Sequence, residues 1–87
     1  MRYKIEITKS AAKDFKDIRE PEKSRIKKKI DSLAESGLEM DNITALKGEF
    51  KGLFRIRSGD FRIVFTIENN TITVIAIVDR KEVYKKK

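Results

Sequence analysis

The sequence predicts an α+β domain in which two helices cover one face of a mainly antiparallel sheet. Two kinds of periodicity support this class. Apolar residues alternate with polar ones, or form a short apolar run, in the segments 3–7, 54–65 and 71–78. They recur at helical spacing between residues 12 and 34. Because the chain has 87 residues, we expect one domain, spanning 1–87, with the order strand, helix, helix and three strands.

The N-terminal half is predicted to form the first strand and a helical hairpin. Ser10 is expected to end the strand and to cap the first helix by accepting a backbone hydrogen bond. Pro21 suits the first turn of the second helix, where its missing N–H costs nothing, and Gly37 suits the residue that ends it. Only a very short link separates the two helices. Residues 38–45 show no clear period and are expected to be irregular.

The next two strands are predicted to meet at a tight turn, Gly59-Asp60. With a two-residue loop, Arg57 lies opposite Arg62 in the hairpin. Arg55 then shares their face, while the apolar residues of both strands fall on the other face. A three-residue loop would mix the two faces, so the pattern favours the shorter one.

This register places like charges opposite each other, which normally destabilises a sheet by a few tenths to about 1 kcal/mol per pair. Three guanidinium groups on one surface are a candidate site for a phosphate-rich partner. The alternative is that nearby carboxylates neutralise them: Asp60 or Glu49 for the face as a whole, and Asp60 or Glu68 for Arg62.

The last predicted strand follows an Asn69-Asn70 turn and runs from Thr71 to Val78. A two-residue loop would pair Ile63 with Ala76. Both faces of this strand are apolar, which indicates a central position in the sheet. Arg80 and Tyr84 follow shortly after it, so they are expected near the surface at its end.

Composition limits the chemistry that is open to the chain. There are 21 Lys and Arg residues against 14 Asp and Glu, a net charge of +7, which favours nucleic acid, an anionic membrane surface or an acidic protein segment as partner. The chain has neither cysteine nor histidine, so we expect no disulfide, no metal site and no cofactor. No apolar run is long enough to span a membrane and no signal-peptide pattern opens the chain, so a cytoplasmic protein without a membrane partner is expected.

Taken together, several motifs resemble the RelE/ParE superfamily of bacterial and archaeal toxins. They are the Ala-x-x-Phe helix after the first strand, Leu46-Lys47-Gly48, the run from Phe54 to Phe65, and the ending Asp79-Arg80-Lys81-Glu82-Val83-Tyr84. The resemblance covers essentially the whole chain. It implies a toxin of a type II toxin–antitoxin pair, with the RelE-like branch favoured: a ribosome-dependent endoribonuclease that cuts messenger RNA in the ribosomal A site. The alternatives are a ParE-like inhibitor of DNA gyrase, which needs no catalytic residues, and an inactive relic of a toxin.

The resemblance also implies the site residues. Those assigned to catalysis are Arg57, Arg62, Arg80 and Tyr84, and those assigned to RNA or phosphate binding are Lys47 and Arg55. Some members of the family have lysine where this chain has Arg55 and Arg57, which matters because arginine does not act as a proton acceptor. The implied partners are a cognate antitoxin, messenger RNA on the ribosome, and operator DNA only through the antitoxin complex.

Overall fold

The computed structural model describes residues 2–40 and 43–79. Its elements in chain order are β1 (Lys4–Ile7), α1 (Lys9–Lys16), α2 (Glu22–Ser36), the 3₁₀ turn η1 (Gly37–Glu39), β2 (Ile43–Ala45), the 3₁₀ turn η2 (Gly48–Phe50), β3 (Phe54–Ser58), β4 (Phe61–Glu68) and β5 (Thr71–Asp79). The predicted α+β class is confirmed, as is the order of a strand, two helices and then strands in one sheet. The prediction that residues 38–45 are irregular is wrong, because β2 lies there as an additional strand, after the end of η1.

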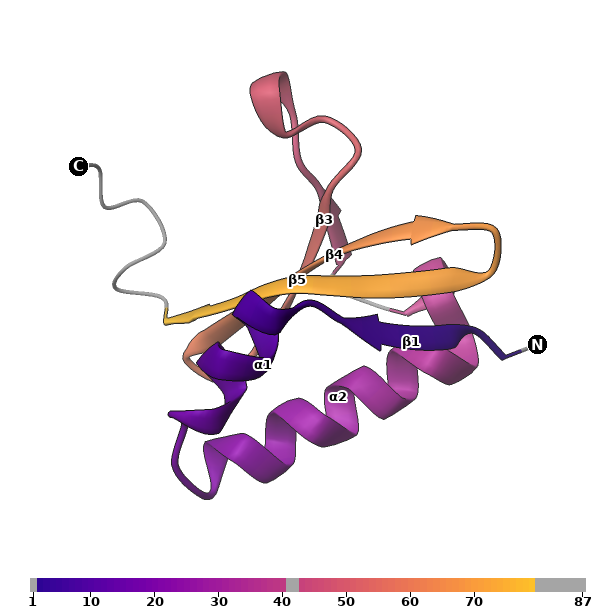
Figure 1. The fold of residues 1–87 in the computed structure, drawn as a ribbon. Helices are drawn as coiled ribbons and strands as arrows, with labels where there is room; N and C mark the ends of the chain where they lie inside the picture. Colours follow the sequence, from indigo (N-terminus) through magenta and orange to yellow (C-terminus); the bar gives the residue numbers. More distant parts are fainter. Residues whose placement is uncertain (1, 41–42, 80–87) are drawn as a thin grey trace.

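The five strands form one sheet in the order β1-β5-β4-β3-β2. β2 to β5 are antiparallel neighbours, and β1 lies parallel to β5 at one edge. α2 runs along one side of the sheet, while the connection that contains η2 projects away from the rest of the molecule (Figure 1). A parallel pair requires a long crossover, and the residues between β1 and β5, helices included, provide it. None of the helices within the described ranges is long and apolar enough to cross a membrane.

The core lies between α2 and the adjacent face of the sheet. Ile26 and Leu33 of α2 are fully buried, as are Ile56 of β3 and Ile63 and Phe65 of β4. Strand side chains alternate between faces, so the neighbours of these strand residues point to the face away from α2. The apolar face and the arginine face of the hairpin are therefore separated as predicted.

The register of the β3–β4 hairpin is also confirmed. Ser58 pairs with Phe61 and Arg57 with Arg62, which leaves Gly59 and Asp60 as a two-residue loop. Gly59 has φ +61°, in the left-handed region that glycine adopts without strain.

The pairing of β4 with β5 differs from the prediction at one point. Ile63 pairs with Ile77 rather than with Ala76, because the register shifts between Val64 and Phe65. One extra residue on β5 at this irregularity brings Ile77 to the core face, where it is 4% exposed. As a consequence, Val78 lies opposite Arg62.

The C-terminal end of α2 agrees with the prediction, whereas Pro21 lies directly before α2 and not in its first turn, and the start of α1 also differs. Thr8, not Ser10, caps α1: its hydroxyl accepts a hydrogen bond from the Ala11 N–H at 3.1 Å, and Ser10 lies inside the helix. Threonine one residue before the helix can reach that N–H, whereas a helical residue cannot take the cap position. Gly37 ends α2 with φ +58°, as predicted.

α1 contributes a side chain to the free edge of β5 beyond the end of β1. Oδ2 of Asp14 accepts a hydrogen bond from the Ile77 N–H at 3.1 Å, over a separation of 63 residues. A strand edge otherwise presents unpaired backbone groups. α1 thus fixes the part of β5 that lies beside Arg62.

Candidate anion-binding site

The arginines of the hairpin gather on the face of the sheet away from α2. Arg55 and Arg57 alternate with buried residues of β3, and Arg62 lies directly opposite Arg57 on β4. Thr44 of β2 pairs with Arg55 and adds a hydroxyl to the same face. Three adjacent strands therefore supply the polar side chains of one surface.

These four side chains line a hollow of about 420 Å³, called the arginine hollow below: Thr44, Arg55, Arg57 and Arg62. Arg57 is exposed, whereas Arg55 and Arg62 are partly buried. The three arginines lie on hydrogen-bonded strands, so the sheet holds the backbone from which each guanidinium group projects. The predicted grouping of the three arginines is confirmed.

The carboxylates that the sequence offered as neutralising partners do not pair with Arg62. Neither Asp60 nor Glu68 forms an ion pair with it, and Arg57 likewise has none among the residues that the structure describes. Nη1 of Arg62 is buried and has no hydrogen-bond partner there. Leaving a buried donor unsatisfied costs about 1–3 kcal/mol, and more when the group is charged. Arg62 thus brings to the hollow a buried cationic donor for which the described part of the chain supplies no acceptor.

Of the other predicted site residues, the structure describes only Lys47. Lys47 is exposed and lies directly before η2, at the base of the projecting connection. It does not line the arginine hollow. Arg80 and Tyr84 lie outside the described residues. Thr44 was missed by sequence reasoning, because its strand has three residues and no periodicity long enough to reveal it.

The arrangement is suited to binding an oxyanion. Arginine stays protonated at any physiological pH and presents donors that match phosphate oxygens in pairs. Among the described residues that line the hollow, the functional groups are one hydroxyl and three guanidinium groups, neither of which serves as a proton acceptor near neutral pH. They are therefore suited to binding negative charge and to stabilising it where it develops, not to moving protons.

The fold is similar to that of solved toxin structures. The toxin–antitoxin complex RelBE2 from Mycobacterium tuberculosis matches with TM-score 0.82 and 19% identity, over 92% of this chain and 100% of that chain. The RelB–RelE antitoxin–toxin complex from Methanococcus jannaschii matches with TM-score 0.74 and 29% identity, over 91% and 94%. YafQ from E. coli matches with TM-score 0.79 and 14% identity, over 97% and 100%.

Sequence comparison identifies the family. A search of curated proteins gives no match. The family model described as "ParE toxin of type II toxin-antitoxin system, parDE" matches residues 5–84, which is nearly the whole chain. Together with the similarity in fold, this match confirms the superfamily expected from the sequence motifs. The chain belongs to the ParE toxin family, within the RelE/ParE superfamily, and is a toxin of a type II toxin–antitoxin system.

Proposed function

We propose that the chain is a ribosome-dependent endoribonuclease that cuts messenger RNA in the ribosomal A site and so inhibits translation. The observation that carries the proposal is the arginine hollow. Arg57 and Arg62 lie side by side on paired strands, without an ion pair to the described residues. A protein that only needs a stable sheet gains nothing from this like-charge pair, whereas a phosphate in the hollow would make the pair favourable.

The reaction that fits these residues is attack of a ribose 2′-oxygen on the adjacent phosphorus. The new O2′–P bond forms as the P–O5′ bond breaks. The 2′-hydroxyl proton passes to a base, and the leaving 5′-oxygen takes up a proton. Negative charge gathers on the equatorial phosphate oxygens in the transition state, and cations held in place by the sheet stabilise that charge more than the ground state. We assign this role to Arg57 and Arg62, with Arg55 binding phosphate beside them.

Thr44 and the three arginines supply no proton acceptor for this reaction. By the resemblance to RelE-like toxins, Tyr84 accepts the 2′-hydroxyl proton or stacks on a base, and Arg80 steadies the leaving oxygen. Nearby cations favour the ionised form of a tyrosine. Lys47 is a further candidate for phosphate binding or for the base. The mechanism uses no metal ion or cofactor.

The proposed partners follow from the toxin class. We propose that a cognate antitoxin covers the basic surface of the toxin, since two of the similar structures are antitoxin–toxin complexes. The proposed site of action is the cytoplasm, where ribosomes translate. Operator DNA would be contacted only by the complex with the antitoxin.

A second candidate function is inhibition of DNA gyrase by binding alone. The name of the matching family favours it, because the model describes ParE toxins. Such a protein needs no residues for proton transfer, and the arginine hollow would then contact protein or DNA. An inactive relic is the third candidate.

One pair of assays separates the three candidates. Purified toxin is added to translating ribosomes, and cleavage of messenger RNA is mapped, while plasmid supercoiling by gyrase is followed in parallel. Arg62→Ala is expected to lower the cleavage rate about 10²–10³-fold, as loss of one preorganised donor to an oxyanion typically does. Arg19→Ala, an exposed arginine between the helices, is the matched control and should cleave like the wild type.

Each outcome supports a different one of the three candidates. Ribosomal cleavage that Arg62→Ala removes supports the nuclease, provided that circular dichroism shows the variant to be folded. Arrest of supercoiling without cleavage supports the gyrase inhibitor. Neither effect from the wild type supports the relic. Rapid cleavage of naked RNA without ribosomes would contradict the dependence on the ribosome.

A further inference from the structure

A second hollow lies on the helix side of the same hairpin. It has a volume of about 290 Å³ and is lined by α2 and by the β3–β4 turn; this lysine hollow comprises Arg25, Lys28, Lys29, Ser32, Ser58 and Gly59. Its side chains are three cations and two hydroxyls. The proposed function does not use any of them.

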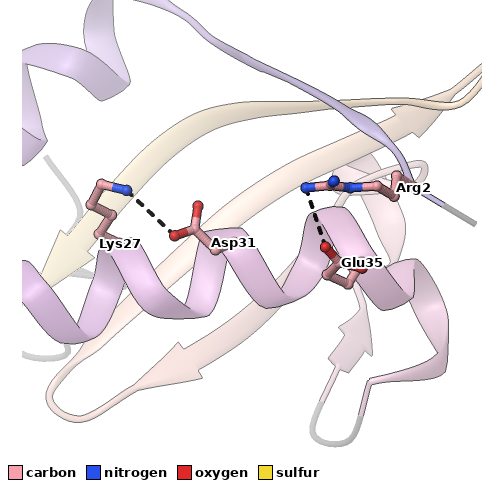
Figure 2. A network of polar contacts seen from close by, with 4 residues as sticks. All are labelled: Arg2, Lys27, Asp31 and Glu35. Atoms are coloured by element: carbon pink, nitrogen blue, oxygen red, sulfur yellow. Dashed lines mark hydrogen bonds and ion pairs between the residues drawn. The ribbon is translucent and has the colours of Figure 1, made fainter.

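Some charges on α2 are ion-paired and others are not. Glu35 pairs with Arg2 at 3.2 Å, and Lys27 pairs with Asp31 at 3.4 Å (Figure 2). Arg25, Lys28 and Ser32 are spaced three and four residues apart, so they share a face, and Glu22 lies three residues before Arg25.

The cations of the lysine hollow lack acidic partners. Arg25, Lys28 and Lys29 form no ion pair within residues 2–40 and 43–79. Among the described residues that line the hollow, three are cations and none is acidic, so three positive charges converge on one concave surface.

Ser58 gives an independent indication that the hollow binds a ligand. It is 5% exposed and is the one buried polar or charged residue in the described part of the chain. No hydrogen bond joins its hydroxyl to the described residues, and the oxygen is not among their fully buried unsatisfied atoms, so it is accessible from the hollow that the residue lines. A serine that is more than nine-tenths buried and lines a cationic hollow is positioned to donate to an anion bound there.

The two hollows lie on opposite faces of one end of the hairpin. Arg57 and Ser58 are consecutive residues of β3, so their side chains point to opposite faces of the sheet. Arg57 lines the arginine hollow and Ser58 the lysine hollow, directly before the exposed Gly59-Asp60 turn. A polymer with one negative charge on each unit can pass around this turn and occupy both.

We propose that the lysine hollow binds a backbone phosphate of the RNA strand whose reacting phosphate lies in the arginine hollow. The inference rests on the proposed function in taking RNA as the polyanion. A phosphate fits better than the carboxylate of an acidic protein segment, since its several oxygens accept from ammonium groups and hydroxyls at once. The hollow thereby positions the strand and takes no part in the chemistry.

Salt dependence of RNA binding tests the proposal without ribosomes. The probe is a labelled oligoadenylate, and its affinity for the full-length toxin is measured between 50 and 200 mM salt. The variant Lys28→Gln/Lys29→Gln, called the hollow variant below, removes two charges from the lysine hollow. The control Lys16→Gln/Lys27→Gln removes two exposed charges outside it, so both variants carry a net charge of +5, two below the wild-type +7.

For single strands, each phosphate contact contributes about 0.7 to the slope of log affinity against log salt. Because the hollow is proposed to hold one phosphate, the Lys28→Gln/Lys29→Gln variant is expected to reduce the slope by about 0.7. Over this fourfold change in salt, wild-type affinity should fall about 2.6-fold more than that of this variant. The control variant should keep the wild-type slope. Equal slopes for the two variants would overturn the proposal.

A second measurement locates the ligand. Titration with inorganic phosphate should shift the amide NMR signals of Ser58 and Gly59 in the wild type and in the control variant. Ser58→Ala, which removes the hydroxyl without changing charge, should weaken the shift at Gly59. Unchanged amide signals at saturating phosphate would overturn the proposal.

A glutamate-rich peptide of the same charge as the RNA tests whether the lysine hollow binds protein instead of RNA. If the hollow variant loses peptide binding but keeps the RNA slope, the hollow is a protein contact and the proposal is wrong. These are binding measurements, so they can succeed even if the wild type cleaves nothing on ribosomes. In that case the proposed function fails and the phosphate site remains.

Discussion

The arginine hollow and the lysine hollow share one hairpin but are built by different elements. Arg57 and Arg62 project from paired strands, whereas Lys28 and Lys29 project from one helix. Arginine presents a planar, rigid set of donors, and lysine a single charge on a flexible stem. The first hollow is therefore suited to preorganised stabilisation of a transition state, and the second to holding a charged strand in varied positions.

Each hollow depends on a different set of packed elements. The arginine hollow requires β2, β3 and β4 in the correct register, while the lysine hollow requires α2 to pack beside the β3–β4 turn. Phe65 serves both, since it is fully buried between sheet and helices and stacks on Phe54 with ring centroids 5.8 Å apart.

The largest expected effect comes from removing this common support. Phe65→Ala should lower the free energy of unfolding by about 3–5 kcal/mol, because it deletes a buried aromatic ring and leaves a cavity. At roughly 0.05–0.15 kcal/mol per residue, a domain of 87 residues has about 4–13 kcal/mol of stability, so urea denaturation should show a large part of that stability lost, together with weaker RNA binding at both hollows. Thr66→Ala, at the next residue and on the other face, should cost less than about 0.5 kcal/mol.

A smaller effect should separate the two hollows. Asp14→Ala leaves the Ile77 N–H without its acceptor, which should cost about 1–3 kcal/mol. Asp14→Asn keeps an oxygen that can accept this hydrogen bond, so it should retain most of the stability that Asp14→Ala loses. Hydrogen exchange at the Ile77 amide should speed up in the alanine variant, with amide signals changing near Arg62 but not at Gly59.

The control for this prediction is Asp17→Ala, an exposed carboxylate at the end of the same helix. Equal loss of stability in both variants would mean that α1 acts through its overall charge and not through the bond to β5.

The smallest expected effect is an increase in stability. Arg57→Gln removes one of two opposed like charges, so urea denaturation should show the free energy of unfolding raised by about 0.2–1 kcal/mol. The same change should weaken RNA binding and slow cleavage. Arg19→Gln removes an equal charge away from the hairpin and should change neither property. A less stable Arg57→Gln variant would mean that the pair does not repel in the folded protein.

Local sequence patterns predicted the parts of the fold that depend on periodicity. Alternation around Gly59-Asp60 was long enough to define the hairpin register, since a shift of one residue would have buried the arginines. Gly37 marked the end of α2, because few other residues adopt its backbone conformation. The parts that were missed lack such signals. β2 has three residues that are defined as a strand only by pairing with β3.

The sequence alone determined that three arginines share one face of a hairpin, because a period of two leaves no other arrangement once the turn has two residues. Only the tertiary structure decided what surrounds them. The bulge in β5 that sets Val78 against Arg62, the Thr44 hydroxyl beside Arg55 and the placement of α2 against Ser58 all arise from contacts between distant segments. Such contacts depend on how elements pack, and packing between elements produces no periodic pattern within a single segment.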